Sequence, residues 1–122
     1  MVQPALFQNE KVLINTCRNG HLEIVKILVK IGAYIHTQKG EALINASEKV
    51  HLDIVQYLVE NRADISSNEY ASLKKAAINK HDEIVRFFIK KGVKKGNEFY
   101  FVLNFYILLV SIKRPIIYAL KL

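Results

Sequence analysis

The chain has 122 residues, of which 51% are hydrophobic, and a formal net charge of +7. This length supplies one compact domain, residues 1–122, that buries roughly two thirds of its unfolded surface. The first ten residues contain neither the basic region nor the long apolar region of a signal peptide, so we expect no such leader. We therefore expect a reducing compartment, the cytoplasm, and the single cysteine, Cys17, agrees with this expectation.

The positive charge is unevenly distributed along the chain. Residues 10–39 carry a net charge of +3, residues 40–69 of −4 and residues 70–99 of +5. A protein that binds phosphates without regard to sequence more often has a continuous basic stripe, because phosphates repeat evenly along a strand. The alternation of sign therefore disfavours nucleic acid as the partner.

A ten-residue segment occurs three times, at an interval of thirty residues. It reads GHLEIVKILV from residue 20, VHLDIVQYLV from residue 50 and KHDEIVRFFI from residue 80. A strict period between 20 and 50 residues is typical of stacked repeats. We therefore predict repeats at about residues 10–39, 40–69 and 70–96.

The first half of each repeat contains an apolar pattern with helical spacing. In the first repeat it consists of Leu13, Thr16 and Cys17, an i, i+3, i+4 triplet. The last two members are small in all three repeats, which lets a helix approach its neighbour closely.

The second half of each repeat predicts a helix of about ten residues with a broad apolar stripe. An isolated helix shorter than roughly 12 to 15 residues is marginal in water, so we expect these helices to need stacking. In the first repeat the stripe consists of Ile24, Val25, Leu28 and Val29.

The residues after this second helix indicate where it ends. Gly32 and Gly92 occupy a position at which a left-handed residue commonly ends a helix. The middle repeat has Arg62 there, so either Arg62 or Asn61 takes the left-handed conformation.

These segments resemble the ankyrin repeat, whose consensus includes G-H-x-x-I/V-V-x-x-L-L-x-x-G-A-D. Residues 20–35 match this consensus almost throughout, and the resemblance extends over roughly residues 10–97. It implies an all-α solenoid of helix-turn-helix repeats that acts as a non-enzymatic protein–protein interaction module, a scaffold or adaptor with a concave binding surface. The period is 30 residues instead of the usual 33, so we expect the hairpin between repeats to shorten to tight turns around residues 37–40 and 66–69.

Short repeats in a chain rich in Lys, Ile and Asn look like the ankyrin arrays of large DNA viruses with AT-rich genomes. A viral source would place the protein in the host cytoplasm. The family's T-P-L-H opening is reduced here to its Leu, at Leu13, Leu43 and Leu73, so the hydrogen bonds of its Thr and His are not expected.

The resemblance also implies which residues bind a partner protein. Two positions just before the G-H pair and the residues at the turn tips vary in the family and face its partners. The first positions are Arg18, Asn19, Glu48, Lys49, Ile78 and Asn79, and the turn tips are Thr37, Gln38, Lys39, Ser67, Asn68, Glu69, Lys94 and Lys95.

Residues 97–122 are interpreted as a divergent fourth repeat that caps the stack. Residues 99–112 have more apolar side chains than one face of a helix can bury. The excess leaves three alternatives open: contact with a partner, self-association, or sequence not selected for folding. A membrane association through the same residues is a further alternative, although 14 residues of helix span about 21 Å of a hydrocarbon core about 30 Å thick.

No signature of catalysis or of a cofactor occurs in the chain. The phosphate-binding, zinc-protease and nucleophile motifs are missing, so we predict no enzyme activity, no cofactor and no metal. His21, His51 and His81 stand on separate repeats about 10 Å apart and are interpreted as structural residues at helix starts. Cys17 is interpreted as an inert packing residue, because Ser47 and Ala77 take its place in the other repeats.

Overall fold

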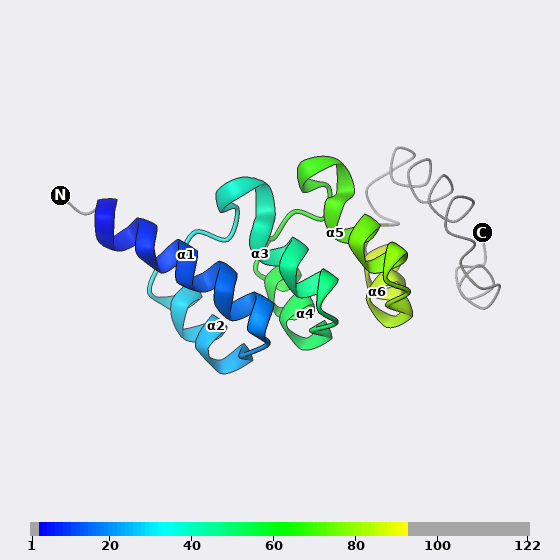
Figure 1. Ribbon diagram of the computed structural model, residues 1–122, viewed down its shortest axis with the longest axis horizontal. Coiled ribbons are helices and arrows are strands. Elements are labelled where there is room, and N and C mark those ends of the chain that lie inside the picture. Colours follow the sequence, from blue (N-terminus) through cyan, green and yellow to red (C-terminus); the bar gives the residue numbers. More distant parts are fainter. Residues whose placement is uncertain (1–2, 93–122) are drawn as a thin grey trace.

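Three pairs of α-helices stack side by side (Figure 1). The computed structural model describes residues 3–92, and within this range it contains no β-strand. The predicted all-α fold, with two helices in each thirty-residue repeat, is confirmed. The first helices of the pairs are α1 (Gln3–Asn19), α3 (Thr37–Glu48) and α5 (Ser67–Ile78), and the second helices are α2 (Leu22–Lys30), α4 (Leu52–Glu60) and α6 (Asp82–Gly92).

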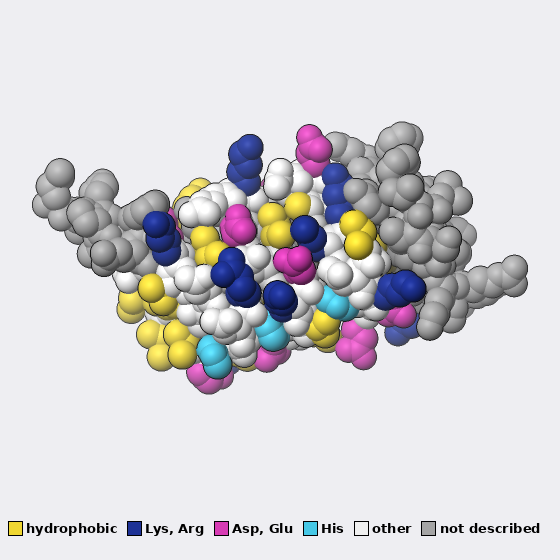
Figure 2. Space-filling model, in the orientation of Figure 1, with side chains coloured by type: hydrophobic (Ala, Val, Ile, Leu, Met, Phe, Trp, Pro, Cys, Tyr) yellow, Lys and Arg dark blue, Asp and Glu magenta, His cyan; other side chains and the backbone are white. Residues whose placement is uncertain are grey.

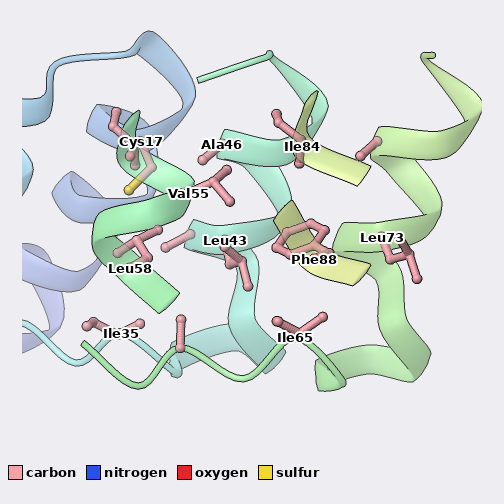
Figure 3. Packing of buried hydrophobic residues seen from close by; sticks show 14 of the residues in the cluster. Cys17, Ile35, Leu43, Ala46, Val55, Leu58, Ile65, Leu73, Ile84 and Phe88 are labelled. Carbon is pink, nitrogen blue, oxygen red and sulfur yellow. The ribbon is translucent and has the colours of Figure 1, made fainter. Parts of the chain in front are cut away.

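The core lies between the row of first helices and the row of second helices. Leu13, Leu43 and Leu73 are almost completely buried, one in each repeat. Figure 3 shows Leu43 of α3 in the middle of this core, with Leu58 of α4 on one side and Phe88 of α6 on the other. Burying one such side chain contributes about 1.5 to 3 kcal/mol, so the leucine at the same place in each repeat links the repeats into one unit.

The small positions of the first helices are buried where these helices pack against one another. α3 lies between α1 and α5. Cys17, Ser47 and Ala77 are at most 1% exposed. The hydroxyl of Ser47 donates to the carbonyl of Leu43 four residues earlier, at 2.8 Å, so this polar group is satisfied inside the helix.

The helices α2 and α4 end in left-handed residues, as the sequence predicts, whereas Gly92 is the last residue of α6 itself. Gly32 has φ 102° and Arg62 has φ 74°, which decides between Arg62 and Asn61 in the middle repeat. The N–H of Arg62 donates to the carbonyl of Val59 and that of Ala63 to the carbonyl of Leu58, at 3.0 and 2.9 Å. This is the Schellman pattern, which satisfies carbonyls that the helix itself leaves open.

The turns between repeats lie close to where the sequence predicts them. Each is a short left-handed segment at the start of the next first helix, although left-handed conformation costs roughly 1 to 2 kcal/mol at each non-glycine residue. At Gly40 the neighbouring repeat comes close, because a Cβ there would lie 2.9 Å from Cβ of Ser67. The left-handed residues are Gln38, Lys39 and Gly40 in one turn and Asn68, Glu69 and Tyr70 in the other.

The apolar stripe of the second helix is only partly buried in the first repeat. Ile24 is 46% exposed, whereas Ile54 and Ile84 at the same place in the other repeats are 0% and 1% exposed. Stacking therefore buries this position of the stripe in the second and third repeats and leaves it exposed at Ile24. The reason is that α4 and α6 each have a preceding second helix against them, and α2 has none within residues 3–92.

The predicted fourth repeat, residues 97–122, and the apolar residues 99–112 lie outside the described residues. Within residues 3–92, no helix has both the length and the apolar character that a membrane span requires.

Candidate functional site

The candidate binding surface is the solvent-exposed side of the first helices together with the turn tips. We call it the recognition face. In Figure 2, basic and acidic side chains lie interspersed over the first helices, which stand in front of the second helices in this orientation. The stack brings the equivalent ends of α1, α3 and α5 into one row, so residues thirty apart in the sequence become neighbours in space.

Six predicted residues lie at the ends of the first helices. Five of them are exposed, and Glu48 is half-buried. Ile78 is 56% exposed and adds one apolar side chain to this row of polar residues. The six are Arg18, Asn19, Glu48, Lys49, Ile78 and Asn79.

An ion pair crosses the recognition face between the second and third repeats. Nζ of Lys75 lies 3.8 Å from Oε2 of Glu48, and both side chains are partly exposed. Lys75 is absent from the predicted site, which begins three residues later on this helix, at Ile78. No signal in the sequence indicates the pair, because it depends on how closely α3 and α5 approach each other.

Two other predicted residues are held by local hydrogen bonds. The guanidinium of Arg18 donates to Oδ1 of Asn15 at 3.0 Å, and the amide of Asn79 donates to the carbonyl of Lys75 at 2.9 Å. Arg18 therefore has other donors available for a partner.

The centre of the recognition face contains a buried amide. Asn45 is 6% exposed, and its Nδ2 has no hydrogen-bond partner within the described part of the chain. A buried amide that lacks a partner costs roughly 1 to 3 kcal/mol. Asparagine is a polar residue that usually lies exposed, so the sequence does not indicate the burial of Asn45.

The turn tips project beyond the helices at the upper edge of Figure 1. Four tip residues are exposed: Gln38, Lys39, Asn68 and Glu69. Ser67 is half-buried, because Gly40 packs closely against it. Glu69 also lies 3.9 Å from Nζ of Lys74. Thr37 is the first residue of α3, with a side chain outside the described atoms, and Lys94 and Lys95 lie outside the described residues.

One family model matches the chain, and its description is ankyrin repeats in three copies. The match covers residues 13–99, well over half of the sequence. The chain belongs to the ankyrin-repeat family. No curated protein and no solved structure matches it. Ankyrin repeats are generally protein–protein interaction modules and are typically not enzymes.

Hydrogen bonds between repeats explain why histidine recurs at the same position of each repeat in this ankyrin stack. Nε2 of His51 lies 2.9 Å from the carbonyl oxygen of Arg18, and Nδ1 of His81 lies 3.0 Å from that of Ser47. A carbonyl oxygen only accepts, so the ring nitrogen that faces it carries the hydrogen and donates. Each ring thus bridges one repeat to the repeat before it, a role beyond the predicted one at the helix start.

His51 and His81 bond through different ring nitrogens because the residue that each ring faces in the preceding repeat differs. A Cβ at Gly20 would lie only 2.5 Å from the ring of His51, so this ring needs a glycine beside it. The equivalent residue in the next junction is Val50, which has a Cβ. His81 therefore cannot take the same position and bonds to a carbonyl one place earlier in the helix.

Cys17 has the environment of a packing residue. It is completely buried, and burial raises the pKa of its thiol from 9.0 to about 12. Only the thiolate is a good nucleophile or metal ligand, and it is scarce at neutral pH when the pKa is raised. Among residues 3–92, no three His, Cys, Asp or Glu side chains lie close enough together to hold a metal ion.

Proposed function

We propose that this ankyrin stack is a scaffold or adaptor that binds a partner protein through the recognition face. The observation that carries the proposal is the row formed by the ends of α1, α3 and α5, where Arg18, Lys49 and Asn79 are exposed. The Glu48–Lys75 ion pair joins two repeats of this row at the surface. Exposed polar and charged side chains of this kind can form hydrogen bonds and ion pairs with a partner protein.

The net charges of the three repeats support a partner with three bands of charge. Residues 10–39 are net positive, residues 40–69 net negative and residues 70–99 net positive. A complementary partner has a positive band that faces Glu48, between two negative bands. Complementary charge raises the association rate more than it lowers the dissociation rate. We further propose that binding takes place in the cytoplasm.

The test compares the full chain with two charge-swapped variants of unchanged net charge. One combines Glu48→Lys with Lys49→Glu on the recognition face, and the control combines Glu60→Lys with Lys90→Glu on exposed positions of the second helices. Each protein is immobilised, and the retained proteins are quantified by mass spectrometry. The proposal predicts a protein retained by the wild type and the control and lost from the recognition-face variant.

The association rate of that protein is then measured. A drop of roughly tenfold or more is expected for the recognition-face swap, because close charge complementarity changes association rates by this order or more. An unchanged rate would refute electrostatic guidance. Retention that is equal for all three proteins would refute the recognition face as the binding site.

A further inference from the structure

The first repeat has apolar side chains on the side that faces away from the stack. Val12, Ile24 and Ile27 are 46%, 46% and 58% exposed. At the places of Val12 and Ile24, the second repeat has Ala42 and Ile54, both 0% exposed because the first repeat covers them. We call this surface, completed by Ile31, the end face.

The end face is also apolar at a position that stays exposed in every repeat. Ile31 is 61% exposed, and the other repeats have Asn61 and Lys91 at its place, both exposed and polar. Stacking alone therefore does not explain an isoleucine there. Figure 2 shows hydrophobic side chains gathered at the lower left, at the α2 end of the stack. Contiguous exposed apolar surface of this kind marks an interaction site.

Charges beside the stripe are arranged for pairing with a copy of the same helix. Ile24 and Ile31 are seven residues apart, which is two helical turns, so they share one side of α2 with Ile27 between them. Glu23 and Lys30 precede them by one residue each and flank the stripe on the same side. The Glu23 side chain is 82% exposed, and its contact in the described chain is Nζ of Lys26 at 3.4 Å.

We infer that the end face binds the end face of a second copy, with the two α2 helices antiparallel about a twofold axis near Ile27. This arrangement places Ile24 of each copy against Ile31 of the other. The same axis places Glu23 beside Lys30 of the second copy, twice, because a twofold interface repeats every contact. Antiparallel helix dipoles add to the attraction. A parallel pair would bring neither set of charges together.

This inference goes beyond the proposed function, since the end face and the recognition face are different surfaces. Dimerisation through α2 leaves the ends of α1, α3 and α5 accessible, so each dimer presents two recognition faces. The failure of one proposal does not affect the other.

Sedimentation velocity of the full chain tests the dimer. A contact between two helices of nine residues is small, and interfaces below about 1,200 Å² are typically weak. We expect a reversible dimer with a dissociation constant of roughly 10 μM to 1 mM. Ile27→Lys should weaken it at least tenfold, while Ile78→Lys, an equally exposed isoleucine on α5, should leave it unchanged. A monomer throughout, or a dimer that Ile27→Lys does not weaken, would overturn the inference.

Disulfide cross-linking of the full chain tests the register. Ile27→Cys should cross-link to itself under mild oxidation, because this position adjoins the twofold axis, whereas Cys17 is buried. Ile24→Cys alone should not cross-link, but a mixture of Ile24→Cys and Ile31→Cys should. Cross-linking of Ile24→Cys to itself would show a parallel pair and contradict the proposed geometry.

Reversal of charge tests the flanking pairs. Glu23→Lys should weaken the dimer by placing two lysines opposite each other, and adding Lys30→Glu should restore it. If the double variant is weaker than Glu23→Lys, the two positions do not face each other.

Discussion

The junction between the first two repeats and the junction between the second and third contain the same elements and close differently. In the first, the His51 ring lies against Gly20 and donates through Nε2 to the carbonyl of Arg18. In the second, Val50 has a positive φ of 67° and His81 donates through Nδ1 to the carbonyl of Ser47. The side chain of Val50, where the first junction has Gly20, thus changes which atoms join two repeats, although both junctions keep their helix packing.

The largest expected effect is at Gly20. Gly20→Ala should lower the free energy of unfolding by about 3 kcal/mol, since it combines left-handed strain with displacement of the His51 ring and loss of its hydrogen bond. Gly32→Ala is the matched control, because Gly32 also has a positive φ but has no atom within 4 Å of the added Cβ. We expect a loss of about 1 to 2 kcal/mol there. Equal losses in urea denaturation would contradict the role given to the ring.

Alkaline pH should destabilise the first repeat through Cys17. The thiol ionises near pH 9.0 when unfolded, whereas the pKa of the buried thiol is about 12, so the unfolded state loses its proton first as the pH rises. The free energy of unfolding should fall by about 1.4 kcal/mol per pH unit in this window, or about 2 kcal/mol at pH 10.5. Comparing denaturation of wild type and Cys17→Ala isolates this contribution. Identical pH dependence above pH 9 would show that burial of the thiol does not matter.

Within the described residues, Ser72 places an unsatisfied hydroxyl at the second junction, where the first junction has Ala42. Its hydroxyl is buried without a hydrogen-bond partner among the described residues, because residues 68–70 before it are left-handed and offer no helical carbonyl. Ser72→Ala, which copies Ala42 of the second repeat, should stabilise the protein by about 1 kcal/mol. Ser47→Ala should instead destabilise it, since the Ser47 hydroxyl donates to Leu43. Thermal unfolding distinguishes the two signs, and a loss of stability in Ser72→Ala would count against the account.

Val50→Gly should make the second junction resemble the first. A β-branched residue at positive φ is strained, and the 53% exposed side chain contributes little burial. After the entropy cost of glycine, we expect a gain of somewhat under 1 kcal/mol. Nitrogen NMR shifts of the His81 ring should change as the ring moves toward the arrangement of His51. A stability loss with an unchanged ring would break the comparison.

Arg62→Gly should give the smallest gain, about 0.5 kcal/mol and a slightly higher melting temperature. Arg62 has a positive φ where the first repeat has Gly32, and glycine removes that strain at some entropy cost. Asn61→Gly is the control and should lower the melting temperature, because the Asn61 amide donates to the carbonyl of Tyr57. A lower melting temperature for Arg62→Gly would contradict the assigned helix end.

The sequence was sufficient to predict the repeats, both helices of each repeat and a left-handed residue at Asn61 or Arg62, where the structure has Arg62. All of these follow from local patterns repeated at one interval, and repetition removes the ambiguity of a single short helix. Partners across repeats were not predictable in the same way. The Glu48–Lys75 pair and the histidine bridges depend on how closely two helices approach, which depends on individual side chains such as Gly20 and Val50.

The sequence predicted which positions belong to the candidate site, but it did not predict which contacts their side chains make. The family pattern indicates which helix ends face solvent, and the residues at the ends of α1, α3 and α5 do so. It does not indicate that Asn45 is buried without a partner, since the neighbouring helices bury it. Nor does it distinguish Ile24 from Ile54, because only the position in the stack leaves one of them exposed.

The central claim is that a partner protein binds the first helices of the stack. Hydrogen–deuterium exchange of the full chain, with and without the protein captured by wild type, tests it most directly. The account predicts slower exchange on binding in residues 41–49 and 71–79, with α4 and α6 unchanged. Slower exchange confined to α4 and α6 would contradict the account and place the binding site on the opposite side.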